Sequence, residues 1–236
     1  MAMTPLEMLE FYETGYKGSQ NGIVIGKQKH DLYLVAQNYH QSFKCKLMQG
    51  LISWRTGIDI PTKYLCDAVD VANVAVDDLK SLGSKNIAED FFIEIAAIIA
   101  FIVNKPFEIH EFSKEGIVFD RLLSFELAQS LNGKSNELEW IEIINKQKKS
   151  RRTELCLLTY NNYRELMFNN DPNKIDELVK KGEELFKKRK TDSFYSGGEA
   201  IEGGGPDNDF TIDYELAAIL KKIDYQGTSI HKYIWS

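Results

Sequence analysis

The sequence predicts an all-α protein, a single bundle of about eight helices. Apolar residues recur at three- and four-residue intervals through most of the chain, the spacing of one helix face. Prolines and capping residues stand where several of these segments begin, and glycine or asparagine stands where others end. Sustained alternation of apolar and polar residues, the mark of a half-buried strand, is lacking.

The first quarter of the chain predicts a short helix, a loop and a long helix. Thr4 and Pro5 suit the N-cap and first position of a helix over residues 5–12. Residues 15–26, with glycine at both ends, predict a loop with brief extended character at 23–25. A helical pattern follows from Lys27 to about Gly57, and its inner face is formed by Leu32, Ala36, Tyr39, Phe43, Leu47 and Trp54.

The second quarter predicts an amphipathic helix and a central one. Pro61 opens the first, whose inner stripe is Leu65, Ala68, Ala72, Ala75, Val76 and Leu79. Residues 86–103 are apolar nearly all round, which places this helix at the centre of the bundle, and Pro106 ends it.

The second half predicts five more helical segments. They cover residues 115–131, stopped by Asn132-Gly133, then 137–145, 155–168, 172–190 and 210–223. Asp171-Pro172 supplies a cap and a first helical residue. Gly203 to Pro206 form a loop before the last segment, and its candidate N-caps are Asp207, Asn208 and Asp209.

We expect one helical domain over residues 1–236, with a possible internal boundary near 132–136. Residues 92–99 resemble residues 213–220, since each has a glutamate, an aliphatic residue, Ala-Ala and two aliphatic residues. The resemblance fits two similar halves with equivalent central helices, and it fits chance similarity between apolar helices equally well. Glu94 and Glu215 lie in these segments and are predicted to be buried structural carboxylates, which must be paired or protonated. The partners considered for Glu94 are Arg121, Arg164 and the tyrosine hydroxyls.

Composition and charge restrict the classes of function. The net charge of −6 disfavours a nucleic-acid binder, which needs clustered positive charge, and it suits a basic partner. Three widely spaced cysteines without a CxxC pair disfavour a disulfide framework or a zinc site. No stretch resembles a secretory signal or a membrane span, so we expect a cytoplasmic protein without membrane contact. The sequence leaves the oligomeric state open.

Motifs for catalysis or metal binding are weak. The four histidines lack the three- or four-residue spacing to a second ligand that presents two ligands on one helix face. The acidic run from Asp207 fails the EF-hand pattern, because Ile212 occupies the glycine position and Ala218 the position of the bidentate glutamate. We therefore expect no cofactor, no metal and no catalytic residues.

Several segments of the second half resemble the helical immunity proteins of bacterial polymorphic toxin systems, in particular the immunity protein 49 family. The resemblance covers roughly residues 140–225. It depends on Arg151 to Leu158, residues 176–186, the run Gly203-Gly-Gly-Pro-Asp-Asn-Asp-Phe210, and Tyr214 to Ala218. It implies a non-enzymatic protein that binds and neutralises a cognate toxin domain.

The acidic segment near the C-terminus is the predicted contact surface for that toxin, which we expect to be basic. An acidic surface steers a basic partner and raises its association rate. The residues chosen for this surface are Asp192, Tyr195 (as an aromatic anchor), Glu199, Glu202, Asp207 and Asp209.

Two other classes of function stay open. One is an intracellular helical adaptor that holds a peptide helix in a groove. The other is a metal-dependent helical enzyme that uses Glu94 or the acidic cluster with Asp209 and Asp213.

Overall fold

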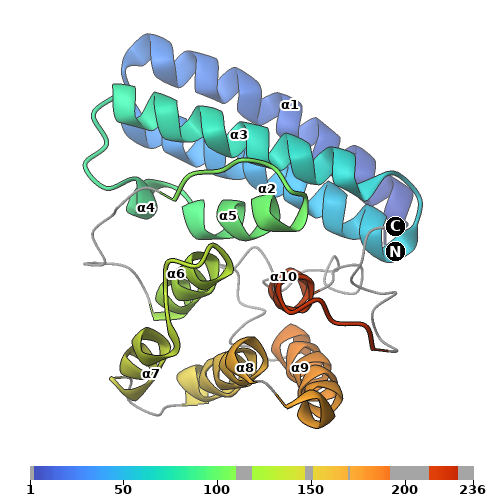
Figure 1. Ribbon diagram of the computed structural model, residues 1–236. Helices are drawn as coiled ribbons and strands as arrows, with labels where there is room; N and C mark the ends of the chain where they lie inside the picture. The colour runs from blue at the N-terminus through green and yellow to red at the C-terminus, as the bar shows by residue number, and fades with distance from the viewer. Residues whose placement is uncertain (1–2, 110–118, 147–150, 170, 192–212, 228–236) are drawn as a thin grey trace. The chain divides into compact units, whose positions relative to one another are not determined.

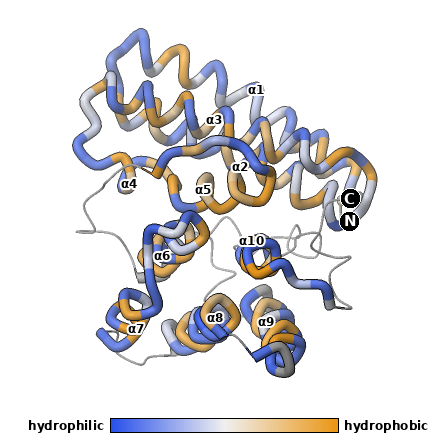
Figure 2. The backbone as a smooth tube through the Cα atoms, in the orientation of Figure 1, coloured by the Kyte–Doolittle hydropathy of each residue, from blue (hydrophilic) through white to orange (hydrophobic). Residues whose placement is uncertain are grey.

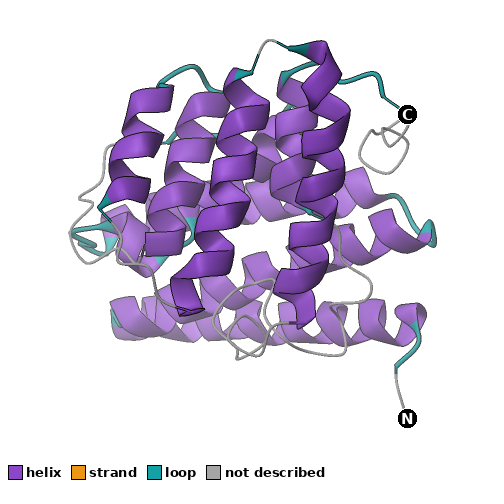
Figure 3. Cartoon of the chain, turned by 90° about the horizontal axis from the view of Figure 1, so that it is seen from below, coloured by secondary structure: helices purple, strands orange, loops and turns teal. Residues whose placement is uncertain are grey.

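A computed structural model describes residues 3–109, 119–146, 151–169, 171–191 and 213–227. Within these ranges the chain forms ten α-helices and no strand, which confirms the all-α prediction with a helix count of ten rather than eight (Figure 3). The chain divides into two compact units, residues 1–117 with 209–212, and residues 118–208 with 213–236.

The first unit contains α1 (Pro5–Lys29), α2 (Leu32–Thr56), α3 (Pro61–Ser81), α4 (Ile87–Asp90) and α5 (Ile93–Ile102). Helix α2 packs against α1 on one side and α3 on the other, and α5 packs against α3 (Figure 1). The largest fully buried side chains of this unit are Met8, Phe43, Leu47, Leu51, Ile52, Leu65, Leu79, Phe91 and Ile93.

The predicted loop at residues 15–26 is wrong, because α1 is one helix of 25 residues. Three of its glycines face α2. A Cβ at Gly15 would lie 3.0 Å from Cys45 Sγ, one at Gly26 would lie 2.7 Å from Val35 Cγ2, and one at Gly22 would overlap the Asn38 side chain. These glycines allow two helices to approach closely, so they serve packing rather than a turn.

The turn between the first two helices also differs from the prediction. His30 adopts a left-handed conformation with φ 53°, and the Asp31 side chain caps α2 by accepting from the Leu34 N–H. The helix expected from Lys27 therefore begins at Leu32. Its predicted end is confirmed, since Gly57 follows α2 with φ 69°.

The apolar segment 86–103 is interrupted rather than continuous. Phe91 adopts an extended conformation between α4 and α5, and its ring packs edge-on against Phe43 of α2 at a centroid distance of 5.4 Å. Phe92 packs in the same way on His40 at 4.2 Å. The break lets both rings reach α2. Beyond it, nine of the ten residues of α5 are buried, and Figure 2 shows this helix as almost entirely hydrophobic.

The second unit contains α6 (Phe119–Leu131), α7 (Glu137–Asn145), α8 (Arg151–Phe168), α9 (Pro172–Thr191) and α10 (Tyr214–Lys222). The predicted boundary near 132–136 lies inside this unit, at the turn between α6 and α7. Gly133 closes the turn with φ 70°, and Trp140 Nε1 donates to Ser130 Oγ at 2.9 Å. The two helices thus share one core.

Helix α10 lies in the core of the second unit. Its first seven residues are all buried, and its N-cap is Asp213 rather than one of the three residues predicted, which lie outside the described ranges. Lys222 near its end donates to the carbonyl of Leu131, the last residue of α6, at 3.0 Å. Each unit thus holds one of the two similar segments as a nearly fully buried helix.

Candidate functional site

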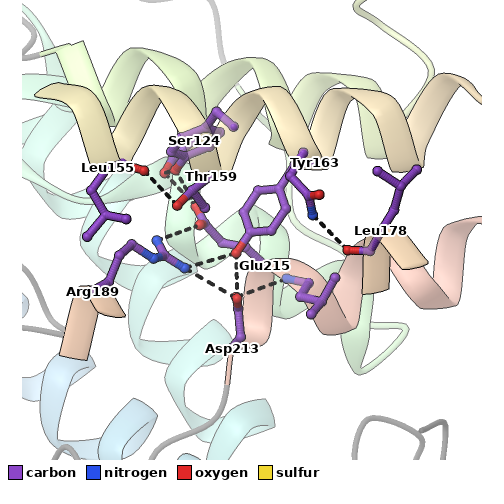
Figure 4. A network of polar contacts seen from close by, with 11 residues as sticks. Ser124, Leu155, Thr159, Tyr163, Leu178, Arg189, Asp213 and Glu215 are labelled. Carbon is purple, nitrogen blue, oxygen red and sulfur yellow. Dashed lines mark hydrogen bonds and ion pairs between the residues drawn. The ribbon is translucent and has the colours of Figure 1, made fainter. Parts of the chain in front are cut away.

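A buried network of polar side chains lies at the centre of the second unit (Figure 4). We call it the Arg189 network. It draws one residue from α6, two from α8, one from α9, and the cap and second residue of α10. Its members are Ser124, Tyr160, Tyr163, Arg189, Asp213 and Glu215.

The Arg189 guanidinium lies within ion-pairing distance of the carboxyl groups of Asp213, the cap of α10, and of Glu215. Its Nη2 lies 3.3 Å from Asp213 Oδ2, and its Nη1 lies 3.5 Å from Glu215 Oε2. Nη2 also donates to the hydroxyl of Tyr163 at 2.9 Å, and that hydroxyl donates to Asp213 Oδ2 at 2.5 Å. Asp213 Oδ1 accepts from the Leu216 N–H at 3.0 Å, so both oxygens of this carboxylate are engaged.

The other oxygen of Glu215 meets two hydroxyl groups. Tyr160 OH lies 2.6 Å and Ser124 Oγ 2.8 Å from Glu215 Oε1, and the two hydroxyl oxygens are 2.6 Å apart. Sequence spacing explains how α8 serves both carboxylates, because Tyr160 and Tyr163 stand three residues apart and share one face.

The network is isolated from water. The exposed fractions of Arg189, Asp213 and Glu215 are 7%, 1% and 2%. Burial raises the pKa of Glu215, and the nearby Asp213 charge raises it further, while Arg189 and the two hydroxyl donors lower it by less. Burial also raises the pKa of Tyr160 and Tyr163, so both hydroxyls are protonated donors.

These contacts define what the network can do. All six side chains are buried. The Arg189 guanidinium joins α9 to α10, and the hydroxyls of Ser124, Tyr160 and Tyr163 join α6 and α8 to the same carboxyl groups. Among the described residues there is no group of three His, Cys, Asp or Glu side chains placed to hold a metal ion. Asp213, considered for the metal-dependent alternative, is committed to the cap of α10 and to Arg189.

A second polar cluster lies in the first unit, around Lys46 of α2. Its Nζ lies 2.9 Å from Glu13 Oε2 of α1 and 4.1 Å from the centroid of the Tyr16 ring. The Tyr64 ring of α3 is 5.7 Å away, and Gln49 Nε2 donates to the same Glu13 oxygen at 3.3 Å. Three helices thus surround one ammonium group. We call this the Lys46 cluster.

The predicted contact residues Asp192, Tyr195, Glu199, Glu202, Asp207 and Asp209 lie outside the described residues. Glu94 and Glu215 are both buried. Arg164, one partner considered for Glu94, lies 3.5 Å from Glu137 of α7.

Sequence reasoning missed the residues that surround Glu215. Arg189 stands in the run Lys187 to Lys190, which is typical of a solvated helix end. The spacing of residues along the helix indicates that Arg189 is buried. Arg189 follows Leu185 by four residues and Phe186 by three, so it continues the buried face of α9.

None of the described helices combines the length and the apolar character required to cross a bilayer. No model of a protein family matches the chain, and no curated protein or solved structure is significantly similar to it. The resemblance to immunity protein 49 therefore stays a prediction from the residues quoted above.

Proposed function

We propose that the protein is an immunity protein, which binds a cognate toxin domain in the cytoplasm and neutralises it without catalysis. The contact surface would be the acidic segment of residues 192–212. This segment contains five acidic residues and no lysine, arginine or histidine. A surface of one charge attracts an oppositely charged partner and accelerates its association.

One observation supports this segment over other surfaces. Arg189 precedes it by three residues and Asp213 follows it directly, and their side chains form a buried ion pair at 3.3 Å. Both flanks of the segment are thereby fixed at one place in the second unit. Fixed ends reduce the conformational entropy that a binding segment loses when it meets a partner.

The test is co-expression with the toxin domain encoded by the neighbouring gene. We expect the protein to restore growth and to bind that domain with an affinity that falls as salt rises. Replacing Asp192, Glu199, Glu202, Asp207 and Asp209 by their amides should slow association by about 10- to 1,000-fold.

A matched control carries the same change in net charge elsewhere. Glu10, Asp77, Glu89, Glu154 and Glu177 are exposed, and their amide variants should retain growth rescue and most of the association rate. Equal loss in both variants would mean that net charge rather than this segment matters. Absence of binding and rescue by the unmodified protein would overturn the proposal.

A further inference from the structure

The Arg189 network contains more negative than positive charge. Glu215 is faced by Ser124 of α6, by Tyr160 and Tyr163 of α8, by Arg189 of α9 and by Asp213, the N-cap of its own helix. One guanidinium thus meets two carboxylates. If both were ionised, the cluster would bury a net charge of −1, which is costly in a medium of low polarity.

The two carboxylates are not equally supported. Asp213 receives the Leu216 N–H, the Tyr163 hydroxyl and Arg189 Nη2. Glu215 Oε2 receives Arg189 Nη1 at 3.5 Å, which is long for a charge-assisted hydrogen bond. Glu215 is therefore the carboxyl group whose ionised form is less stabilised.

The number of hydrogen atoms needed around Glu215 Oε1 also indicates that this carboxyl group carries a proton. This atom, Ser124 Oγ and Tyr160 OH form a triangle with sides of 2.6, 2.6 and 2.8 Å. Each side is a hydrogen-bond distance and requires one hydrogen atom. The two hydroxyl groups supply only two hydrogens. A proton on the carboxyl group supplies the third, so that each oxygen donates once and accepts once.

We propose that Glu215 is protonated in the folded protein and releases this proton to solvent when α10 leaves the core, so that the seating of α10 is linked to pH. A carboxyl whose pKa is higher in the folded than in the unfolded chain stabilises the fold fully below the unfolded value. That stability is lost as pH rises through the folded value. Burial raises the pKa of Glu215, which is the direction that this proposal requires. Rising pH should therefore loosen α10, and this requires no toxin partner.

The experiment compares urea unfolding of the wild type and Glu215→Gln between pH 4.5 and 8. The amide of this variant would keep the shape and the neutral state of a protonated glutamate. We expect the unfolding constant of the wild type, relative to that of the variant, to rise by up to tenfold per pH unit between the unfolded and the folded pKa of Glu215, and to level off above the folded pKa. Glu154→Gln is the control for the loss of one carboxylate, because Glu154 lies exposed on α8, the helix that carries Tyr160 and Tyr163. It should keep the wild-type slope.

Two further measurements keep the inference testable if Glu215→Gln does not fold. Carbon-13 NMR of the wild type, with the side-chain carboxyl signals assigned, should show that Glu215 is protonated at neutral pH. Amide exchange in residues 216–222, corrected for its intrinsic pH dependence, should accelerate as pH rises. An ionised Glu215 at neutral pH, or identical pH profiles for the wild type and Glu215→Gln, would overturn the proposal.

Discussion

Lys46 is a charged residue whose environment replaces most of its hydration. Its side chain is 8% exposed, whereas its partner Glu13 is 37% exposed, so the ion pair reaches the surface only through the carboxylate. Burial by itself raises the pKa of Glu13. The hydrogen bonds from Lys46 and Gln49 outweigh this and hold the pKa below its usual range. The Tyr16 and Tyr64 rings supply further attraction for the cation.

Glu13 provides an internal comparison at the residue scale, because Lys17 lies 3.7 Å from its other oxygen and is 73% exposed. We expect Lys46→Met to lower the free energy of unfolding by about 1–3 kcal/mol, since it removes a buried charge-assisted hydrogen bond. Lys17→Met should change it by less than about 0.5 kcal/mol, because exposed ion pairs are weak. Urea denaturation at neutral pH measures both, and equal effects would contradict the importance assigned to burial.

At the scale of single elements, α1 and α2 form an antiparallel pair with a seam of small residues. Gly26 meets Val35, Gly22 meets Asn38 and Gly15 meets Cys45, so the register is constant along the pair to within one residue. Gln20 Nε2 adds a hydrogen bond to Ser42 Oγ at 3.0 Å. The glycines follow one another at spacings of seven and four residues, the spacing of a helix seam.

Two glycines of α1 should respond in opposite ways to the same substitution. A Cβ at Gly26 would lie 2.7 Å from Val35 Cγ2 and 3.2 Å from the Val35 backbone nitrogen, so Gly26→Ala should destabilise the protein by about 1–3 kcal/mol. A Cβ at Gly18 meets nothing within 4 Å. Gly18→Ala should stabilise by about 0.5–1 kcal/mol through helix propensity alone. Thermal or urea unfolding would reveal the sign, and stabilisation by both would show that the seam tolerates a methyl group.

This seam also explains the largest error of the sequence-based prediction. Glycine is equally compatible with a turn and with close helix packing, and the chain around residues 15–26 does not distinguish them. The difference lies in Val35, Asn38 and Cys45, which belong to the next helix along the chain. For the helix at residues 137–145, the signals for its start and its end lie in the neighbouring sequence. Prediction and structure agree on its bounds.

At the scale of the whole molecule, the two compact units each have a hydrophobic core. Phe43, Leu47 and Leu65 are fully buried in the first unit, and Phe125, Trp140 and Leu216 in the second. A unit with its own core is capable of unfolding by itself.

Cavity-forming substitutions test this organisation. Leu47→Ala and Leu216→Ala each remove a fully buried side chain and should cost about 2–5 kcal/mol. We expect Leu47→Ala to increase amide exchange chiefly in peptides from residues 3–109, and Leu216→Ala chiefly in peptides from 119–191 and 213–227. Peptide-resolved hydrogen exchange measures this. A uniform increase along the chain in both variants would mean that the protein unfolds as one cooperative body.

The sequence by itself determined the helical class, most helix ends and the burial of two glutamates in apolar helices. These properties depend on neighbours within a few turns, which the spacing of apolar residues records. Only the tertiary structure decided that the glycines of α1 pack against α2, that Phe91 and Phe92 interrupt an apolar helix, and that Arg189 pairs with Asp213 and Glu215. Each of these depends on which helix faces which, and that choice is made by side chains distant in the chain.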